Sequence, residues 1–134
     1  MEITKQQIIF TNGCMDCLHV GHIRLLKHCK SLGHVIVGLN SDASVRALKG
    51  HTRPINNQDD RKELLLALKH VDEVIIFDDP TPYELIKQIR PDIIVKGGDY
   101  KPENVVGNDI SKVIIFNYID GYSTTNIINK AKIL

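Results

Sequence analysis

The sequence predicts a single α/β domain built on a five-stranded parallel sheet with helices on both of its faces. The chain has 134 residues, of which 43% are hydrophobic, and this length and composition suit one compact core. Five short apolar runs alternate along the chain with segments of helical periodicity. Strands that alternate with helices pair in parallel, because each crossover helix packs back onto the sheet. The domain is therefore expected to cover residues 1–134.

The strands are predicted from the apolar runs, which are rich in isoleucine and valine, as parallel strands covered on both faces should be. They span residues 8–10, 35–39, 74–77, 93–95 and 113–116. The first run leads into Thr11-Asn12-Gly13, whose composition predicts a turn. This alternation of elements is that of a Rossmann-like domain.

The helices are predicted from apolar periodicity and from residues that start or stop a helix. Residues 20–31 carry apolar side chains at helical spacing, and Gly33 ends that helix. Ser41 or Asp42 can cap a short helix that ends near Leu48.

Three more helices complete the predicted domain. One covers residues 59–69, and its apolar side is formed by Leu64, Leu65 and Leu68. Pro82 starts the next helix at a favoured early position, and that helix stops before Pro91. The last helix opens at residues 123–125.

Polar segments follow the strands at residues 11–22, 40–53 and 96–99, and a fourth, residues 120–125, comes shortly after the fifth strand. Ligands of open parallel sheets bind outside the carboxyl ends of the strands. We therefore expect all four segments to converge on one crevice.

Overall charge argues against several function classes. The formal net charge is +1 with 25% charged residues, which gives no bulk reason to expect a nucleic-acid partner. No apolar run reaches the roughly 18 residues that a membrane span needs. The N-terminal residues are polar and resemble no signal peptide. We therefore expect a cytoplasmic protein without nucleic-acid or membrane partners.

Two histidines flank a glycine at the start of the first predicted helix, in His19-Val20-Gly21-His22. A helix N-terminus presents unpaired N–H groups and a partial positive charge, which suit a phosphate. Gly21 would let a phosphate approach the backbone closely, and both histidines could donate hydrogen bonds to it. Spacing alone does not separate this hypothesis from two histidines on the surface.

The same segment suggests a metal site as an alternative, because Cys14 and Cys17 form a C-x2-C pair beside the histidines. Zinc sites usually take paired ligands from two separated segments, whereas these four residues are crowded into one short segment. The three cysteines of the chain also make a full disulfide framework improbable. We expect neither a structural metal nor a redox pair at these cysteines.

The stretch from Thr11 to His22 resembles the H-x-G-H signature of the cytidylyltransferase-like nucleotidyltransferase superfamily. It is similar to one branch in particular, the nucleotidyltransferase domain of the heptose-1-phosphate adenylyltransferases, or ADP-heptose synthases. Further matches to this branch lie at residues 40–45, 48–54, 95–103 and 120–128. H-x-G-H alone is moderately specific, but K-G-G-D-Y-K-P and S-T-T-N-I-I make the combination highly specific. The resemblance covers nearly the whole chain.

The resemblance implies an enzyme that transfers a nucleoside monophosphate from a nucleoside triphosphate to a sugar 1-phosphate and releases pyrophosphate. Heptose 1-phosphate is the expected acceptor and ATP the favoured donor, with CTP as the alternative, so that the product would serve lipopolysaccharide synthesis. Mg²⁺ would accompany the triphosphate through phosphate oxygens and water, with no named protein ligand. A homodimer is the family expectation. A glycerol-3-phosphate-type cytidylyltransferase and a nucleotide-binding module without catalysis remain as alternatives.

The chain departs from the family pattern in three ways. Met15 stands where the family usually has phenylalanine, and its thioether can fill much the same apolar space. Cys17 replaces a residue that is commonly apolar. We expect no kinase domain ahead of this one, although the family often carries it, so a separate sugar kinase would supply the acceptor.

Family resemblance and side-chain chemistry together suggest the residues that act on phosphate. His19, His22 and Lys49 are the expected catalytic residues, because they can stabilise charge in the transition state. Lys49 and Arg53 suit substrate phosphates, unless their loop is merely solvated. Arg61 lies near a helix start, where the helix dipole disfavours a cation. It would bind a substrate phosphate, or else form a surface or subunit-contact salt bridge.

The nucleotide is expected to lie against the glycine turn, the end of the fourth strand and the start of the last helix. Asp16 would orient the site through a histidine or magnesium, or make only a local turn bond. Glycines after Lys96 allow close approach to a base or ribose, and Ser-Thr-Thr suits the β- and γ-phosphates. The expected nucleotide contacts are Asn12, Gly13, Cys14, Met15, Asp16, Gly21, Lys96, Gly98, Asp99, Ser123, Thr124 and Thr125.

Overall fold

The computed structural model of the chain describes residues 5–117 and 124–133. Strands and helices alternate along it as predicted. The elements are β1 (Ile8–Gly13), α1 (Val20–Leu32), β2 (His34–Asn40), α2 (Asp42–Lys49), α3 (Gln58–Leu66), β3 (Glu73–Phe77), α4 (Tyr83–Ile89), β4 (Ile93–Gly97), the 3₁₀ helix η1 (Pro102–Asn104), β5 (Lys112–Phe116) and α5 (Thr124–Ile133). Within these residues, no helix combines the length and apolar character needed to cross a membrane.

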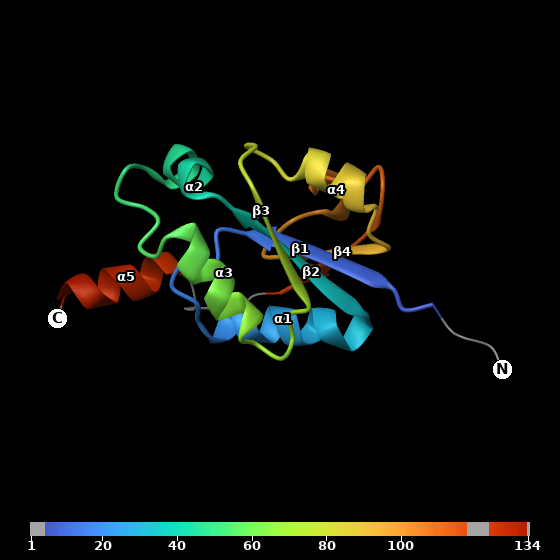
Figure 1. Cartoon of the computed structure of the whole chain (residues 1–134), viewed down its shortest axis with the longest axis horizontal. Helices are drawn as coiled ribbons and strands as arrows, with labels where there is room; N and C mark the ends of the chain where they lie inside the picture. The colour runs from blue at the N-terminus through green and yellow to red at the C-terminus, as the bar shows by residue number, and fades with distance from the viewer. Residues whose placement is uncertain (1–4, 118–123, 134) are drawn as a thin grey trace.

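The five strands form one parallel sheet in the order β3-β2-β1-β4-β5. Helices α1 and α3 cover one face of the sheet and α4 covers the other (Figure 1). Leu26 and Leu65 are fully buried on the first face, and Ile86 is fully buried on the second. The predicted five-stranded, Rossmann-like α/β domain is therefore confirmed.

The carboxyl ends of β1 and β4 separate from each other. The two strands pair only at Ile9 with Ile93 and at Phe10 with Ile94, although both strands continue for three residues beyond that point. β1 keeps its pairing with β2 to the end, whereas β4 pairs onward with β5. An opening therefore forms at the position where the strand order reverses, which is where parallel sheets bind ligands.

Two local predictions were wrong. The predicted turn at residues 11–13 is the end of β1, because these residues continue the ladder with β2. Helix α3 ends at Leu66 rather than at residue 69, and Leu64 faces solvent while Leu65 is buried. Tertiary pairing and packing decided both positions. The predicted cap at Ser41 is confirmed, because its Oγ accepts from the N–H of Ser44 at 3.2 Å.

Candidate active site

A cleft of about 600 Å³ lies at the carboxyl ends of the strands. Three of the four polar segments predicted to converge contribute to its wall. The predicted site residues on the wall are Asn12, Gly13, Cys14, Met15, Asp16, His19, His22, Lys49, Arg53 and Lys96. Of the fourth segment, Ser123 and the side chains of Thr124 and Thr125 lie outside the described residues.

His19 and His22 form a reciprocal cap at the start of α1. His19 is the N-cap residue, and its Nδ1 accepts from the N–H of Gly21 at 3.0 Å. Nδ1 of His22 in turn accepts from the N–H of His19 at 3.1 Å, and the two ring centroids are 4.0 Å apart. The sequence thus builds the histidine pair locally, through the three-residue spacing of a capping box.

This cap corrects the expected role of Gly21. Its N–H is occupied by the His19 ring, and the residue is buried and is not part of the cleft wall. The helix start therefore does not present this N–H to a phosphate. Gly21 belongs to the cap, and the imidazole rings become the groups that α1 directs to the cleft.

The capping bonds also fix the protonation state of both rings. A nitrogen that accepts an N–H carries no hydrogen, so the hydrogen of each neutral ring is on Nε2. Burial lowers the pKa of His19, and burial followed by the neighbouring His19 lowers the pKa of His22 to about 4. Both side chains are therefore neutral Nε2–H donors at neutral pH, a state suited to phosphate oxygens.

Three cationic side chains line the same cleft: Lys49, Arg53 and Lys96. The Nζ of Lys96 lies 4.9 Å from the ring centroid of Tyr100, a cation–π contact. Burial lowers the pKa of Lys96, and the positive charge of Lys49 acts in the same direction, against the opposing influence of Cys14. Burial also raises the pKa of Cys14, which keeps its thiol neutral. The cleft thus concentrates positive charge and suits an anionic ligand.

Asp16 positions Arg53 and the loop around it. Its Oδ2 accepts from Nε of Arg53 at 3.1 Å and from the N–H of Ile55 at 2.7 Å, and its Oδ1 accepts from the N–H of Asn56 at 3.0 Å. The side chain is fully buried. These bonds connect Asp16 to Arg53 and to the loop at residues 55 and 56. Its expected role in orienting the site through a histidine or magnesium stays a prediction.

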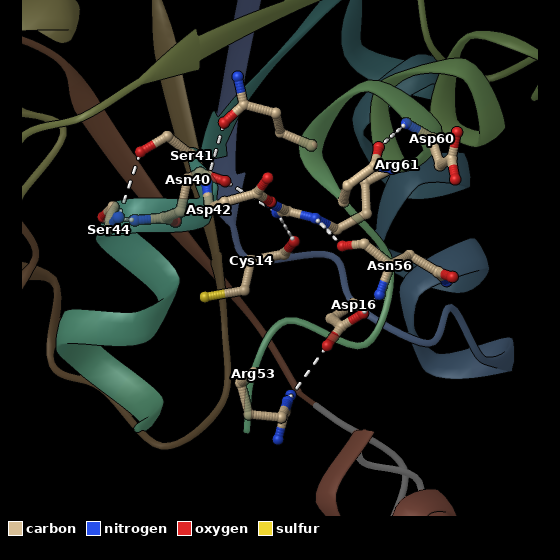
Figure 2. Close-up of polar contacts among 12 residues, drawn as sticks. Cys14, Asp16, Asn40, Ser41, Asp42, Ser44, Arg53, Asn56, Asp60 and Arg61 are labelled. Atoms are coloured by element: carbon tan, nitrogen blue, oxygen red, sulfur yellow. Dashed lines mark hydrogen bonds and ion pairs between the residues drawn. The ribbon is translucent and has the colours of Figure 1, made fainter. Parts of the chain in front are cut away.

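The hypothesis that Arg61 binds a substrate phosphate was wrong. Its guanidinium is fully buried and donates to three carbonyl oxygens and to the carboxylate of Asp42, which it meets at 2.8 Å (Figure 2). The carbonyls are those of Cys14 at 2.7 Å, Asn40 at 2.8 Å and Asn56 at 2.9 Å. Since four of its five N–H groups have protein acceptors, Arg61 connects the segments around the cleft and does not face a ligand. It is equally not a surface salt bridge.

Two residues expected after β4 do not reach the cleft wall. The chain turns at Gly98, which has a φ of 109° and donates its N–H to the carbonyl of Phe116 at 3.0 Å. Asp99 beyond it is exposed. Lys96 and Gly97 line the cleft instead.

Sequence reasoning missed nearly half of the cleft wall. The missed residues are Thr11, Leu25, Asn40, Leu48, Pro80, Thr81, Pro82, Tyr100 and Val106. Residues 80–82 begin three positions after the end of β3, so the rule that ligands bind at strand ends could have found them. Leu25 and Val106 carry no such signal, because their position depends on packing.

The described cleft wall offers few side chains that could bind a metal ion directly. Asp16 is the sole carboxylate on the described cleft wall, and both of its oxygens accept protein N–H groups. Across residues 5–117 and 124–133, no group of three or more His, Cys, Asp or Glu side chains is placed to hold a metal. Phosphate oxygens and water are the usual magnesium ligands in such a setting.

Comparison with known proteins gives a consistent family. The sequence model described as cytidylyltransferase-like matches residues 10–130. The chain is 54% identical over 127 residues to the bifunctional protein HldE of Aliarcobacter butzleri and 55% identical over 129 residues to that of Nitratiruptor sp.. These matches cover 93% and 95% of this chain but only 27% and 28% of the relatives, so the chain spans about a quarter of their length.

Solved structures agree with the family match. A lipopolysaccharide core biosynthesis protein from Thermoplasma volcanium superposes with a TM-score of 0.73 at 28% identity, over 87% of this chain and 100% of that one. A pantothenate synthetase from Thermus thermophilus superposes with a TM-score of 0.64 at 18% identity, over 93% of this chain and 62% of that one. The second likeness shows a shared fold.

Replacing Arg61 tests whether this residue is structural. Arg61→Met would leave three carbonyls without their donor, and we expect a loss of about 3 kcal/mol or more in the free energy of unfolding, measured with urea. Arg46→Met, an exposed position on α2, should change stability by less than about 0.5 kcal/mol. An Arg61→Met protein that kept its stability but no longer bound phosphate ligands would restore the rejected role.

The His22 cap predicts a pH-dependent stability. The unfolded chain takes up a proton on His22 below its ordinary pKa of 6.5, whereas the folded protein does so only near pH 4. The unfolded state binds more protons in this window, so the protein loses stability as the pH falls. Relative to His22→Gln, the free energy of unfolding should fall by up to about 1.4 kcal/mol per pH unit between these values. Parallel urea-stability curves for the two proteins would contradict the assignment.

Proposed function

Because the chain belongs to the cytidylyltransferase-like family, we propose that it transfers a nucleoside monophosphate from a nucleoside triphosphate to a sugar 1-phosphate. The superfamily resemblance seen in the sequence is confirmed by the family match. Within this proposal the acceptor is heptose 1-phosphate and the favoured donor is ATP. The support is the resemblance at residues 40–45, 95–103 and 120–128, together with the solved relative described as a lipopolysaccharide core biosynthesis protein.

The observation that carries the proposal is the neutral histidine pair in a cationic cleft. His19 and His22 are held by the cap with their Nε2–H groups as donors, and Lys49, Arg53 and Lys96 surround the same cavity. Neutral Nε2–H donors and cationic side chains can stabilise negative charge on a phosphate without changing their own protonation state. Such preorganised groups are the main source of catalysis in phosphate transfer.

In the proposed reaction, a phosphate oxygen of the sugar 1-phosphate attacks the α-phosphorus of the nucleotide in line with the leaving group. The bond between the α-phosphorus and its bridging oxygen breaks, and pyrophosphate leaves with the electron pair. The attacking phosphate is already ionised, so no strong general base is needed, and positioning dominates. His19 and His22 stabilise the charge on the α-phosphate, while Lys49 and Arg53 hold the acceptor phosphate. Magnesium, when bound with the nucleotide, would neutralise charge on the triphosphate and on the pyrophosphate.

The remaining parts of the proposal concern setting and assembly. We place the reaction in the cytoplasm, where nucleoside triphosphates are available, with a sugar kinase supplying the acceptor. A homodimer stays a prediction that sedimentation or light scattering can test.

A matrix of donors and acceptors tests the proposed function. ATP and CTP are each combined with heptose 1-phosphate, hexose 1-phosphates and glycerol 3-phosphate, and pyrophosphate release is measured. We expect ATP with heptose 1-phosphate to give the highest kcat/KM, and glycerol 3-phosphate to fall below it by orders of magnitude, because a site built for ring hydroxyls leaves polar groups unpaired with a short acceptor. Efficient synthesis of CDP-glycerol would assign a different branch, and no turnover in any combination would favour a binding module.

His22→Ala tests the role of the histidine pair. Loss of one transition-state donor should lower kcat by about two to three orders of magnitude while the fold survives. His28→Ala, farther along α1 and outside the cleft wall, serves as the matched control and should retain turnover. Near-normal turnover in the His22 variant would remove this residue from the mechanism.

A further inference from the structure

The cleft has two halves, which lie on either side of β1. The sheet order places β4 on one side of β1, with Lys96 and Gly97 at its end, and places β2 and β3 on the other. The wall residues of the second half are Asn40, Leu48, Lys49, Pro80, Thr81 and Pro82. This second half therefore combines one cation, Lys49, with polar and apolar side chains.

Asn40 is the most constrained polar residue of this half. It is the last residue of β2, and only 4% of its surface is exposed although it lines the cleft. Its carbonyl accepts from Arg61 at 2.8 Å, and the next N–H, that of Ser41, donates to the carbonyl of Phe77 at 2.9 Å. The backbone that carries the side chain is therefore fixed on both sides.

A chain of hydrogen bonds orients the Asn40 amide. Its Nδ2 donates to Oγ of Ser44 at 2.9 Å, and that hydroxyl donates to the carbonyl of Asp79 at 3.4 Å. The direction of the chain is set at its far end, because a carbonyl oxygen can only accept. Ser44 must therefore accept from Asn40, which turns the amide oxygen Oδ1 away from α2.

The amide oxygen is the part of Asn40 that reaches the cleft. Among residues 5–117 and 124–133, no protein group donates to Oδ1. The same residues include no fully buried side-chain oxygen or nitrogen without a partner, so Oδ1 must have access to the cavity. A nearly buried acceptor such as Oδ1 favours a ligand that donates a hydrogen bond to it, because a buried acceptor without a donor destabilises the complex.

We propose that the β2/β3 half of the cleft is the acceptor subsite and that Asn40 selects the acceptor by accepting a hydrogen bond from one of its ring hydroxyls. This inference rests on the proposed function. An ionised phosphate oxygen has no hydrogen to donate, so Oδ1 discriminates against phosphate at this point and favours a hydroxyl. Lys49, on the same half, can hold the acceptor phosphate, and the exposed side chain of Leu48 offers an apolar wall to a sugar ring.

The test compares Asn40→Ala with wild type, using heptose 1-phosphate as acceptor and ATP as donor. We expect kcat/KM for the acceptor to fall about 10- to 100-fold, as for loss of a buried hydrogen bond. The Kd for a non-hydrolysable ATP analogue, measured by calorimetry without acceptor, should stay within about twofold. Asn104→Ala, an exposed position on η1, is the matched control.

Two further measurements separate selection of a hydroxyl from a structural role. Ser44→Ala removes the group that orients the Asn40 amide, so it should raise the acceptor KM by a smaller factor than Asn40→Ala does. This variant also tests the inference if Asn40→Ala fails to fold. In calorimetry, wild type should distinguish mannose 1-phosphate from one of its monodeoxy analogues, and Asn40→Ala should lose that discrimination.

The outcomes distinguish this inference from the proposed function. A wild-type enzyme that turns over heptose 1-phosphate, together with an Asn40→Ala variant that keeps its acceptor KM or loses ATP affinity instead, overturns the inference alone. If wild type binds sugar 1-phosphates without turnover, the calorimetric comparison still decides the role of Asn40. A wild type that neither binds nor converts any sugar 1-phosphate overturns both.

Discussion

The buried guanidinium of Arg61 is the contact on which the site depends. It joins the loop after β1, the end of β2, the first turn of α2 and the loop before α3, through Cys14, Asn40, Asp42 and Asn56. A buried cation is costly unless its donors are satisfied, so these four segments must keep their positions together. The four hydrogen bonds that satisfy the charge of Arg61 therefore also fix these segments relative to one another (Figure 2).

Asp16 completes this arrangement with the opposite charge. Asn56 donates its N–H to Asp16 and accepts at its carbonyl from Arg61, so one peptide segment lies between a buried anion and a buried cation. Arg53, three residues earlier, bonds to Asp16 through Nε. Buried ion pairs contribute little to stability but can favour one conformation over others. Here the contacts of Asp16 fix the loop that carries Arg53 to the cleft.

The electrostatic potential of the cleft depends on which of its side chains are charged and which are neutral. Burial keeps His19, His22 and Cys14 neutral, whereas Lys49 and Arg53 remain as cations on the wall. The formal net charge of the whole chain is only +1, so the attraction for anions is a local property of the cleft. A phosphate ligand would meet fixed donors whose protonation does not need to change.

The sequence by itself determined the parallel sheet and the histidine pair, because both depend on local patterns. Apolar runs report strands buried on two faces, and the spacing of His19 and His22 is the spacing of a capping box. Only the tertiary structure decided the roles of Arg61 and Asp16. Arg61 meets Cys14 across 47 residues of chain and Asp16 meets Arg53 across 37, and no periodicity records such distant bonds. A cation that looks solvent-exposed in sequence is buried here, because the fold supplies acceptors from four segments at once.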